Sequence, residues 1–418
     1  MNGKKMMIIG AGPAAQAAAK AMRKLDYSAE ITFITREETM PYSPVALPYL
    51  INGDLTSEAL FEKGEKLVKD LNVNVITGKA VIAVDPAKKE VILQGDEAMA
   101  YDKLLIASGA SPKGLKVDGL KNEDLLVFRT MADFEKLNTQ IKPNSEVLIY
   151  GAGLVAVEVA EHLSESGIKV TIVVRSYLLR KYFSQDNIKK LQAQFEKHGV
   201  RIIEGKTFLQ GKKEGERFNV ELNDGTKLSA DQVIMAVGVN PNVIGGDLFE
   251  QCDGGILVNQ YLETSHSDIY AAGDVVAAQD YAGELIGTCP ISPEAAQQGY
   301  VAGRNMLGAD EKYAGWVSCN YLRCFKENLF SIGVLESESD RYDERLEKVD
   351  TDKNIKLYFK GDFLVGVEGY NMKSVHPGVF RHLICEQVPI VNERELLLSK
   401  PKETAMWMMM KYHDAVKN

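Results

Sequence analysis

Hydrophobic and polar positions follow one pattern twice along the chain. The apolar run Met6–Ile9 leads into a glycine-rich turn and then into an alanine-rich stretch with helical spacing. The run Val147–Tyr150 starts the same pattern again. A second apolar run, rich in β-branched residues, follows each helix at 31–35 and at 170–174. Each repeat therefore predicts a strand, a turn, a helix and a second strand.

The two turns read Gly-Ala-Gly-Pro-Ala-Ala from Gly10 and Gly-Ala-Gly-Leu-Val-Ala from Gly151. In this context the first glycine allows the tight turn, the second lets backbone approach a pyrophosphate, and a third small residue lets helix pack on strand. The helix N-terminus adds free N–H groups and a partial positive charge. We therefore predict two dinucleotide sites, and with them hydride transfer between two dinucleotides. The predicted contacts are Gly10, Gly12, Pro13, Ala14 and Ala15 in the first turn, and Gly151, Gly153, Leu154 and Val155 in the second.

The end of the second strand should carry a group that binds the ribose. In the first repeat Thr35 stands where an acid is common, and Glu37 follows two residues later. We predict Glu37 as the ribose ligand. The alternative is that Arg36 and Glu37 are solvated loop charges.

The second repeat has no carboxylate at this place, because its strand is followed by Arg175. An acid would bond the 2′-hydroxyl of NAD, whereas an arginine accommodates the 2′-phosphate of NADP. Arg175, with Arg180 and Lys181 nearby, favours NADPH slightly, although a neutral strand end accepts both NAD(H) and NADP(H).

Other strands end in small residues, where backbone passes close to a ligand. One is Leu104–Pro112, and a similar run, Val233–Asn242, contains Gly238. Both are interpreted as crossovers between domains. The run Ile269–Val275 predicts a strand, a small turn and one acid. Downstream, Ser292 is predicted as the N-cap and Pro293 as the first residue of a helix that runs to about Leu307.

From about Ala314 the pattern changes to alternating strand-like runs, which predict a third, mainly antiparallel domain. The chain has 418 residues, 45% of them hydrophobic, which suffices for two or three domains with full cores. Its net charge of −9 disfavours a nucleic-acid partner. No stretch approaches the roughly 18 apolar residues that span a membrane. The five cysteines are scattered without a CxxC motif, as in a reduced, cytoplasmic protein.

The order of these pieces resembles the FAD- and NAD(P)-dependent pyridine nucleotide-disulfide oxidoreductases. The resemblance covers nearly the whole chain and rests on both turns and on the segments Ala107-Ser108-Gly109, Ala236-Val237-Gly238 and Ala272-Gly273-Asp274, with Glu158 after the second turn. It implies an α/β fold with two Rossmann-like domains and a C-terminal α+β domain. The implied ranges are 1–112 with 240–312 for FAD, 113–239 for NAD(P), and 313–418 for a C-terminal interface domain that forms dimers in relatives.

The resemblance also implies roles for single residues. Ala107, Ser108, Gly109, Gly238 and Gly273 would contact the cofactors, and Asp274 would bond the flavin ribityl chain. The helix after Ser292 would direct its N-terminus at the flavin, which favours an anionic reduced ring. Glu158 would contact the nicotinamide, with an ordinary helix charge as the alternative.

One departure from the family changes the expected chemistry. Relatives that use a thiol carry a cysteine in the stretch that here runs Pro44–Tyr49, and this chain has Val45 in its place. A valine forms neither a sulfenate nor a mixed disulfide. Direct flavin chemistry remains, with Pro44 beside the cofactor and no protein residue as acid or base.

The segment after Tyr42 is most similar to cysteine-free flavin subunits and reductases that partner iron–sulfur proteins. These include the flavin subunits of phenylglyoxylate and aldehyde oxidoreductases, NAD(P)H oxidoreductases associated with CO dehydrogenase, and rubredoxin or ferredoxin reductases. The resemblance implies an FAD-dependent NAD(P)H oxidoreductase that exchanges single electrons with a separate iron–sulfur protein or subunit, alone or in a larger complex. The alternatives are an NAD(P)H oxidase that uses oxygen and a flavin-binding scaffold or redox sensor.

Overall fold

The computed structural model describes residues 3–373 and 375–417, and the chain divides into two compact units. The first unit is assembled from three segments, Met1–Lys113, Arg129–Phe134 and Val239–Trp316. The second comprises the remaining segments, Gly114–Phe128, Glu135–Gly238 and Val317–Asn418. Because several segments contribute to each unit, chain neighbours in sequence are not always neighbours in the fold.

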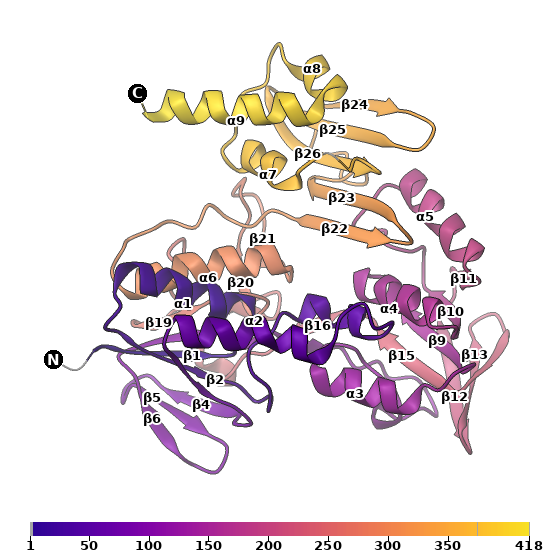
Figure 1. Ribbon diagram of the computed structural model, residues 1–418, viewed down its shortest axis with the longest axis horizontal. Coiled ribbons are helices and arrows are strands. Elements are labelled where there is room, and N and C mark those ends of the chain that lie inside the picture. The colour runs from indigo at the N-terminus through magenta and orange to yellow at the C-terminus, as the bar shows by residue number, and fades with distance from the viewer. Residues whose placement is uncertain (1–2, 374, 418) are drawn as a thin grey trace. The chain divides into compact units, whose positions relative to one another are not determined.

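The first unit is built on a five-stranded parallel sheet in the order β19-β7-β1-β2-β3 (Figure 1). Its strands are β1 (Lys5–Ile9), β2 (Glu30–Ile34), β3 (Val73–Ile76), β7 (Lys103–Ile106) and β19 (Ile269–Ala271). Residues 6–9 of the central strand are all buried, as expected for a parallel sheet covered on both faces. This burial explains the uninterrupted apolar run in the sequence.

Helices α1 (Pro13–Leu25) and α6 (Ser292–Met306) pack closely on each other in the first unit. A Cβ added at Gly299 would lie 2.0 Å from the carbonyl oxygen of Ala14, and one added at Gly303 would lie 2.5 Å from that of Ala18. Only glycine fits at these two contacts. The tight packing places the middle of α6, at Gly299, against the first turn of α1.

Smaller elements complete the first unit. They are η1 (Pro44–Leu50), α2 (Ser57–Asp70), β4 (Val81–Asp85), β5 (Glu90–Leu93), β6 (Ala98–Ala100), β8 (Ala110–Pro112), β16 (Val239–Pro241), η3 (Gly246–Leu248), β17 (Gln251–Cys252), β18 (Gly255–Leu257), β20 (Val276–Gln279) and β21 (Ile286–Thr288). Strands β8 and β16 pair antiparallel with each other. They lie in the two runs predicted as crossovers, and the unit boundaries fall directly beside them.

The second unit contains another parallel sheet, ordered β11-β10-β9-β15. Its strands and their neighbours are β9 (Glu146–Gly151), β10 (Lys169–Val174), β11 (Arg201–Glu204), β15 (Gln232–Ala236), η2 (Asn122–Asp124), α4 (Leu154–Glu165), α5 (Gln185–Lys197) and the hairpin strands β12 (Phe208–Glu214), β13 (Arg217–Leu222) and β14 (Lys227–Ala230). Helix α3 (Met131–Gln140) begins in the first unit and ends in the second.

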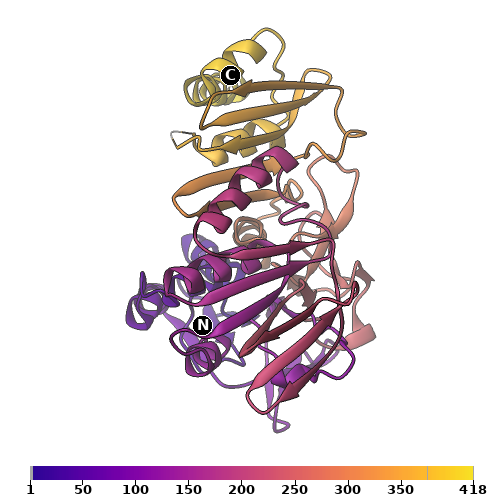
Figure 2. The ribbon, with the colours of Figure 1, turned by 90° about the vertical axis from the view of Figure 1, so that its right-hand side faces the viewer.

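The same unit includes an antiparallel sheet from the C-terminal part of the chain, ordered β22-β23-β26-β25-β24. Its elements are β22 (Cys319–Cys324), β23 (Glu327–Gly333), β24 (Glu344–Val349), β25 (Asn354–Lys360), β26 (Phe363–Tyr370), α7 (Pro377–Cys385), α8 (Arg394–Ser399) and α9 (Pro401–Lys417). Figure 2 shows α5, in magenta, beside these orange strands.

The predicted α/β class with two parallel sheets is confirmed, and the third region is antiparallel as expected. The division into three domains stays a prediction. One local prediction was wrong by a residue: the N-cap of α6 is Ile291, and Ser292 is the first helical residue. Proline fits either of the first two helical positions, so Pro293 did not fix the register. Among the described residues, no helix is long and apolar enough to cross a membrane.

Candidate functional site

The first glycine turn leaves β1 and enters α1 with little room for side chains. Gly10 has φ +111°, and a Cβ there would lie 2.2 Å from the carbonyl oxygen of Ala107. Gly12 is different, because no atom lies within 4 Å of an added Cβ. Ala15 is fully buried, as predicted for the small third position. The turn is thus closed on the side of the sheet and open at Gly12, the position predicted to approach a pyrophosphate.

The turn after β19 joins the same edge of the sheet. Gly273 has φ +87°, and a Cβ there would lie 3.2 Å from the Cβ of Ala14. Its N–H donates to Oε1 of the buried Gln298 at 2.8 Å, which connects the turn to α6. The structure therefore brings the Gly273–Asp274 turn to the beginning of α1, as parallel strands that end at one edge require.

Arg129 is a member of this group that no sequence motif had indicated. Its Nη2 lies 2.6 Å from Oδ2 of Asp274, and the same atom is the nearest neighbour of a Cβ built at Gly109, at 3.9 Å. Arg129 precedes α3, where Thr130 and Asp133 form reciprocal hydrogen bonds of the capping-box kind. The Thr-x-x-Asp spacing was visible in the sequence and could have located this helix start.

Glu37 lies in a hydrogen-bonded chain. The hydroxyl of Tyr42 donates to Oε2 of Glu37 at 2.6 Å and accepts from the backbone N–H of Met131 at 2.9 Å. Burial, and then the negative charge of Glu37, raise the pKa of Tyr42, so the phenol stays a donor. Glu37 is half-buried and hydrogen-bonded, so it is not a freely solvated loop charge, and its role as the ribose ligand stays a prediction.

Three further predicted residues occupy defined local positions. The hydroxyl of Ser108 donates to the carbonyl oxygen of Asn242 at 2.7 Å, so its side chain fastens the strand end to the crossover. Pro44 starts the 3-10 helix η1, where Val45 is 57% exposed. Ser292 starts α6, and the fully buried Glu294 in that first turn accepts from Tyr313 at 2.7 Å.

These residues fit FAD on three observations. The surface at Gly12 is open, and the first turn of α1 contains no acidic residue that would repel a pyrophosphate. Glu37 lies just beyond the second strand, where a ribose would be bonded. Asp274 follows β19 at the same edge of the sheet.

The second glycine turn repeats the backbone geometry. A Cβ at Gly151 would lie 2.1 Å from the carbonyl oxygen of Ala236, and one at Gly153 would meet only the Tyr182 hydroxyl, at 3.7 Å. Leu154 and Val155 form the start of α4, and Ala156 is fully buried. Two more predicted residues lie near strand ends: exposed Arg175 directly after β10, and Gly238, with φ +105°, shortly after β15.

Glu158 lies on α4, one turn beyond the glycines. Burial, and then the nearby charge of Glu161, raise its pKa to about 7. Glu161 itself is buried and accepts the backbone N–H of Phe325. Glu158 has no such hydrogen bond among the described residues, so nothing of that kind offsets the effect of burial on its pKa.

Thiol and metal chemistry find little support in the described residues. Cysteines 252, 289, 319, 324 and 385 form no disulfide. Cys319 and Cys324 occupy the two ends of β22, and of these two only Cys324 is fully buried. No group of three or more metal-binding side chains occurs in the part of the chain that the structure describes.

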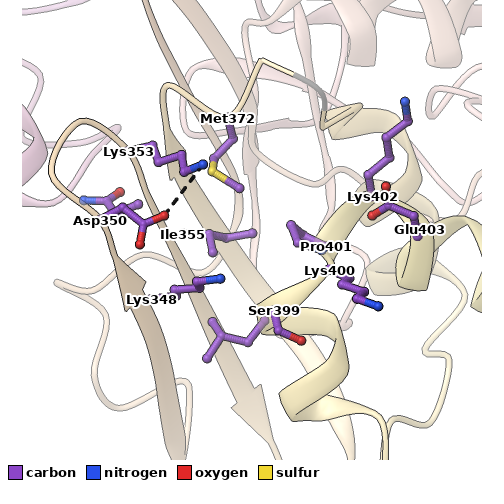
Figure 3. Close-up of a pocket in the computed structure, with 12 residues that line it drawn as sticks. Lys348, Asp350, Lys353, Ile355, Met372, Ser399, Lys400, Pro401, Lys402 and Glu403 are labelled. Atoms are coloured by element: carbon purple, nitrogen blue, oxygen red, sulfur yellow. Dashed lines mark ion pairs between the residues drawn. The ribbon is translucent and has the colours of Figure 1, made fainter.

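Two cavities of similar volume occur among the described residues. One, of about 440 Å³, is lined in the first unit by residues of α1, η1 and α2, including Gln16 and Tyr42. The other, of about 430 Å³, lies in the C-terminal part between β24, β25 and the start of α9 (Figure 3). Four lysines line it, and one of them, Lys353, pairs with Asp350. None of the predicted cofactor contacts lines either cavity. Pro44 follows Ser43 in the chain, and Ser43 lines the first cavity.

The fold and the two glycine turns define a flavoprotein class with two dinucleotide sites. The pattern of the pyridine nucleotide-disulphide oxidoreductase family matches residues 4–299. The chain therefore belongs to this family, whose members use FAD together with NAD(P)H, and the predicted cofactors are confirmed at that level.

Two curated relatives and one solved structure illustrate the range of the family. The chain is 30% identical over 408 residues to the epsilon subunit of NADH-dependent phenylglyoxylate dehydrogenase from Aromatoleum evansii, covering 95% of both chains. It is 30% identical to NADH-rubredoxin oxidoreductase from Clostridium acetobutylicum, covering 81% of this chain and 83% of the relative. The water-forming NADH oxidase from Lactobacillus brevis superposes with a TM-score of 0.85 at 20% identity, over 99% of both chains. This last likeness shows the fold.

Proposed function

We propose that this protein is an FAD-dependent NAD(P)H oxidoreductase that passes single electrons to an iron–sulfur protein or subunit. The observation that carries the proposal is the pair of open glycine turns combined with Val45 at the family's thiol position. Two dinucleotide sites support hydride transfer, and the missing thiol leaves no protein group to receive the electrons. FAD, when bound, supplies both hydride acceptance and one-electron release.

The residues of the first unit would hold and tune this cofactor. Backbone N–H groups at Gly12 and the start of α1 would bind the pyrophosphate, with Pro13, Ala14 and Ala15 shaping the helix start. Glu37 would bond the adenosine ribose, and Asp274 the ribityl chain, with Arg129 keeping the Asp274 carboxylate in place. The N-terminus of α6 would stabilise negative charge on the reduced ring.

The residues of the second unit would bind the nicotinamide dinucleotide. Gly153 and the start of α4 would take its pyrophosphate, and Arg175 would lie beside the adenosine ribose. Because Arg175 is exposed and has no ion pair among the described residues, we assign NADPH as the preferred nucleotide. No protein acid or base is assigned, because positioning and electrostatics suffice for hydride transfer.

The names of two relatives support an iron–sulfur protein or subunit as the electron acceptor. One transfers electrons between NADH and rubredoxin, and another is a subunit of a larger dehydrogenase. No cysteines of this chain are spaced for a cluster, so the cluster would lie on a partner. An oxidase that uses oxygen is the second candidate, because an NADH oxidase has the same fold.

Anaerobic stopped-flow reduction tests the proposal. Flavin bleaching by NADPH and by NADH is followed, and the reduced protein is then mixed with oxidised rubredoxin, ferredoxin or oxygen. Fast bleaching, followed by faster reoxidation with an iron–sulfur protein than with oxygen, is expected. Faster reoxidation by oxygen would make the protein an oxidase, and no bleaching by either nucleotide would reject both enzymes in favour of a flavin-binding scaffold.

The variant Gly153→Val provides a matched control. Its FAD content should equal that of the wild type, and dithionite should still reduce it. Reduction by NADPH at low concentration should slow by at least about tenfold, because the valine side chain takes the place of the pyrophosphate. An unchanged rate of reduction by NADPH would show that the nucleotide does not bind at this turn.

A further inference from the structure

The segment that connects β10 to α5 is pressed against the second glycine turn. The N–H of Leu179 donates to the carbonyl oxygen of Ala152, between the two glycines, at 2.7 Å. Leu179 has φ +51°, a left-handed conformation that costs an ordinary residue roughly 1–2 kcal/mol. Leu178 and Leu179 are fully buried. Packing and this hydrogen bond therefore maintain a backbone shape that the segment would not adopt alone.

The same segment presents positive charge outward. Arg175, Arg180 and Lys181 are exposed, and none of them forms an ion pair with another described residue. Three unpaired cations beside a dinucleotide turn are suited to an anionic group such as a ribose 2′-phosphate. They can act together only if the backbone that carries them stays fixed.

Two buried side chains of opposite charge hold the far end of the segment. Lys356 on β25 and Glu368 on β26 lie opposite each other in the C-terminal sheet, and both are fully buried. The carboxylate of Glu368 accepts the backbone N–H of Ser184 at 3.0 Å and the Ser184 hydroxyl at 2.7 Å. It also accepts Nδ2 of Asn187 at 2.6 Å. The ammonium of Lys356 donates to the Ser184 hydroxyl at 2.9 Å.

This arrangement replaces the ordinary cap of α5. Ser184 is the N-cap residue, yet its side chain makes no capping hydrogen bond to its own helix. A serine in this position usually accepts an N–H of the first turn, a bond that needs no distant partner. Here the hydroxyl donates to Glu368 and accepts from Lys356 instead. Ser184 therefore connects the nucleotide-binding part to the C-terminal sheet instead of capping its own helix.

The charges of the pair are compensated from both sides. Lys356 also contacts Asp186 at 2.6 Å and Glu336 at 3.2 Å. Burial alone would lower the pKa of Lys356, but the Asp186 hydrogen bond and the surrounding acids hold it above its usual value. Buried pairs of this kind rarely add net stability over apolar residues, and their retention is better explained by specificity or positioning.

We propose that Lys356 and Glu368 are positioning residues for nucleotide selectivity: they fasten Ser184 and thereby fix the 175–184 segment whose cations bind the 2′-phosphate. This inference rests on the proposed function, because it assigns a nucleotide to the second glycine turn. It adds that two residues of the C-terminal sheet, neither of them a predicted nucleotide contact, control how well NADP is distinguished from NAD.

Binding of NADP⁺ and NAD⁺ to the FAD-loaded protein tests the proposal without turnover. Glu368→Gln keeps the size of the side chain, and Lys356 keeps Asp186 and Glu336 as partners. The variant should weaken NADP⁺ binding by roughly five- to tenfold and NAD⁺ binding by less than about twofold. The double variant Glu368→Gln, Lys356→Met should show the same selective loss without a buried charge.

Glu161→Gln is the matched control. Glu161 is also a buried carboxylate, and it also links the nucleotide-binding part to the C-terminal sheet, through the N–H of Phe325. Among the described residues, no hydrogen bond or ion pair joins Glu161 to the 175–184 segment. The control should lower the melting temperature and leave the ratio of the two dissociation constants unchanged. If Glu368→Gln behaves like this control, the pair is only structural and the proposal is overturned.

Limited trypsin digestion supplies a readout that needs no nucleotide. Arg180 and Lys181 are exposed cleavage sites on the fastened segment, so cleavage there should be faster in Glu368→Gln than in the wild type or in Glu161→Gln. Equal cleavage rates would overturn the positioning role. Should the wild type bind neither nucleotide, the proposed function fails while the digestion still tests the fastening. A wild type that binds NAD⁺ more tightly would overturn the assignment of the cations to a 2′-phosphate.

Discussion

The two glycine turns have the same backbone geometry, but the residues beyond their second strands differ. Both first glycines leave no room for a Cβ, which would lie 2.2 Å from a carbonyl oxygen at Gly10 and 2.1 Å at Gly151. Beyond the second strand, the first unit offers the acid Glu37, held by Tyr42, and the second offers Arg175. On the proposed function, the turn would recognise the pyrophosphate common to all dinucleotides, and the residues after the second strand would distinguish one dinucleotide from another.

The helices after the turns differ in one further position. Ala17 on α1 corresponds to Glu158 on α4, each five residues after the second glycine. An alanine leaves the first helix electrically neutral at this place. Glu158 gives the second helix a carboxyl group with a pKa of about 7, raised by burial. The corresponding position of the first helix has no group that can change its charge in this pH range.

The largest expected effect separates the two glycines of the first turn. Gly10→Ala should destabilise the fold by about 3 kcal/mol, because its Cβ would collide with Ala107 and its φ is positive. Gly12→Val should abolish FAD binding while the cofactor-free protein keeps its stability to within about 0.5 kcal/mol. Gly12 has φ −75° and ψ −169°, which valine adopts readily. Denaturant unfolding and the FAD-to-protein ratio measure both effects, and full FAD content in Gly12→Val would reject the first site.

A smaller effect concerns Glu158 and pH. Its pKa rises from 4.5 to about 7 on folding, so the folded state retains a proton that the unfolded state releases. The resulting stabilisation is complete below about pH 4.5 and is lost as the pH rises to about 7. Glu158→Gln should remove this slope and stabilise the protein above pH 7 by up to about 3 kcal/mol.

Unfolding by denaturant across pH 5 to 8 checks this prediction. Glu165→Gln changes a more exposed carboxylate at the other end of the same helix and should leave the slope intact. A wild-type slope that persists in Glu158→Gln would mean that another group is responsible for it.

The smallest effect tests the difference between the strand ends. Arg175→Ala should weaken NADP⁺ binding by about tenfold, or 1.4 kcal/mol, and change NAD⁺ binding by less than about twofold. Calorimetric titration of both nucleotides measures the two constants. Arg201→Ala is a suitable control, because Arg201 is an exposed arginine at the start of β11, away from the carboxyl end of the sheet. An equal loss of affinity for both nucleotides would show that Arg175 does not distinguish NADP from NAD.

Much of the fold could be predicted because its signals are local. The apolar runs became β1 and β9, the small residues at Ala15 and Ala156 are fully buried, and the crossovers mark the unit boundaries. Glycine spacing, strand length and burial are properties that neighbouring residues encode. The same holds for Val45, whose chemistry is evident from its identity alone.

The remainder depends on contacts between distant residues. Arg129 meets Asp274 across 145 positions, and Ser184 meets Glu368 across 184. No local pattern marks such partners, and a buried lysine such as Lys356 is not distinguishable from a surface lysine within a strand. The N-cap of α6 was misplaced for the opposite reason: two adjacent residues both suit a helix start, and only the backbone decides between them.

The order in which the sheet of the first unit is assembled has a consequence for synthesis. Strand β7 ends at residue 106, but its neighbour β19 begins at residue 269, after most of the second nucleotide region has been made. A chain growing from the ribosome therefore carries an unpaired strand edge for much of its translation, a condition that invites aggregation. Asp274, which we propose to bond the flavin, emerges later still, so on that proposal the flavin can be fully held only when translation is well past the middle of the message.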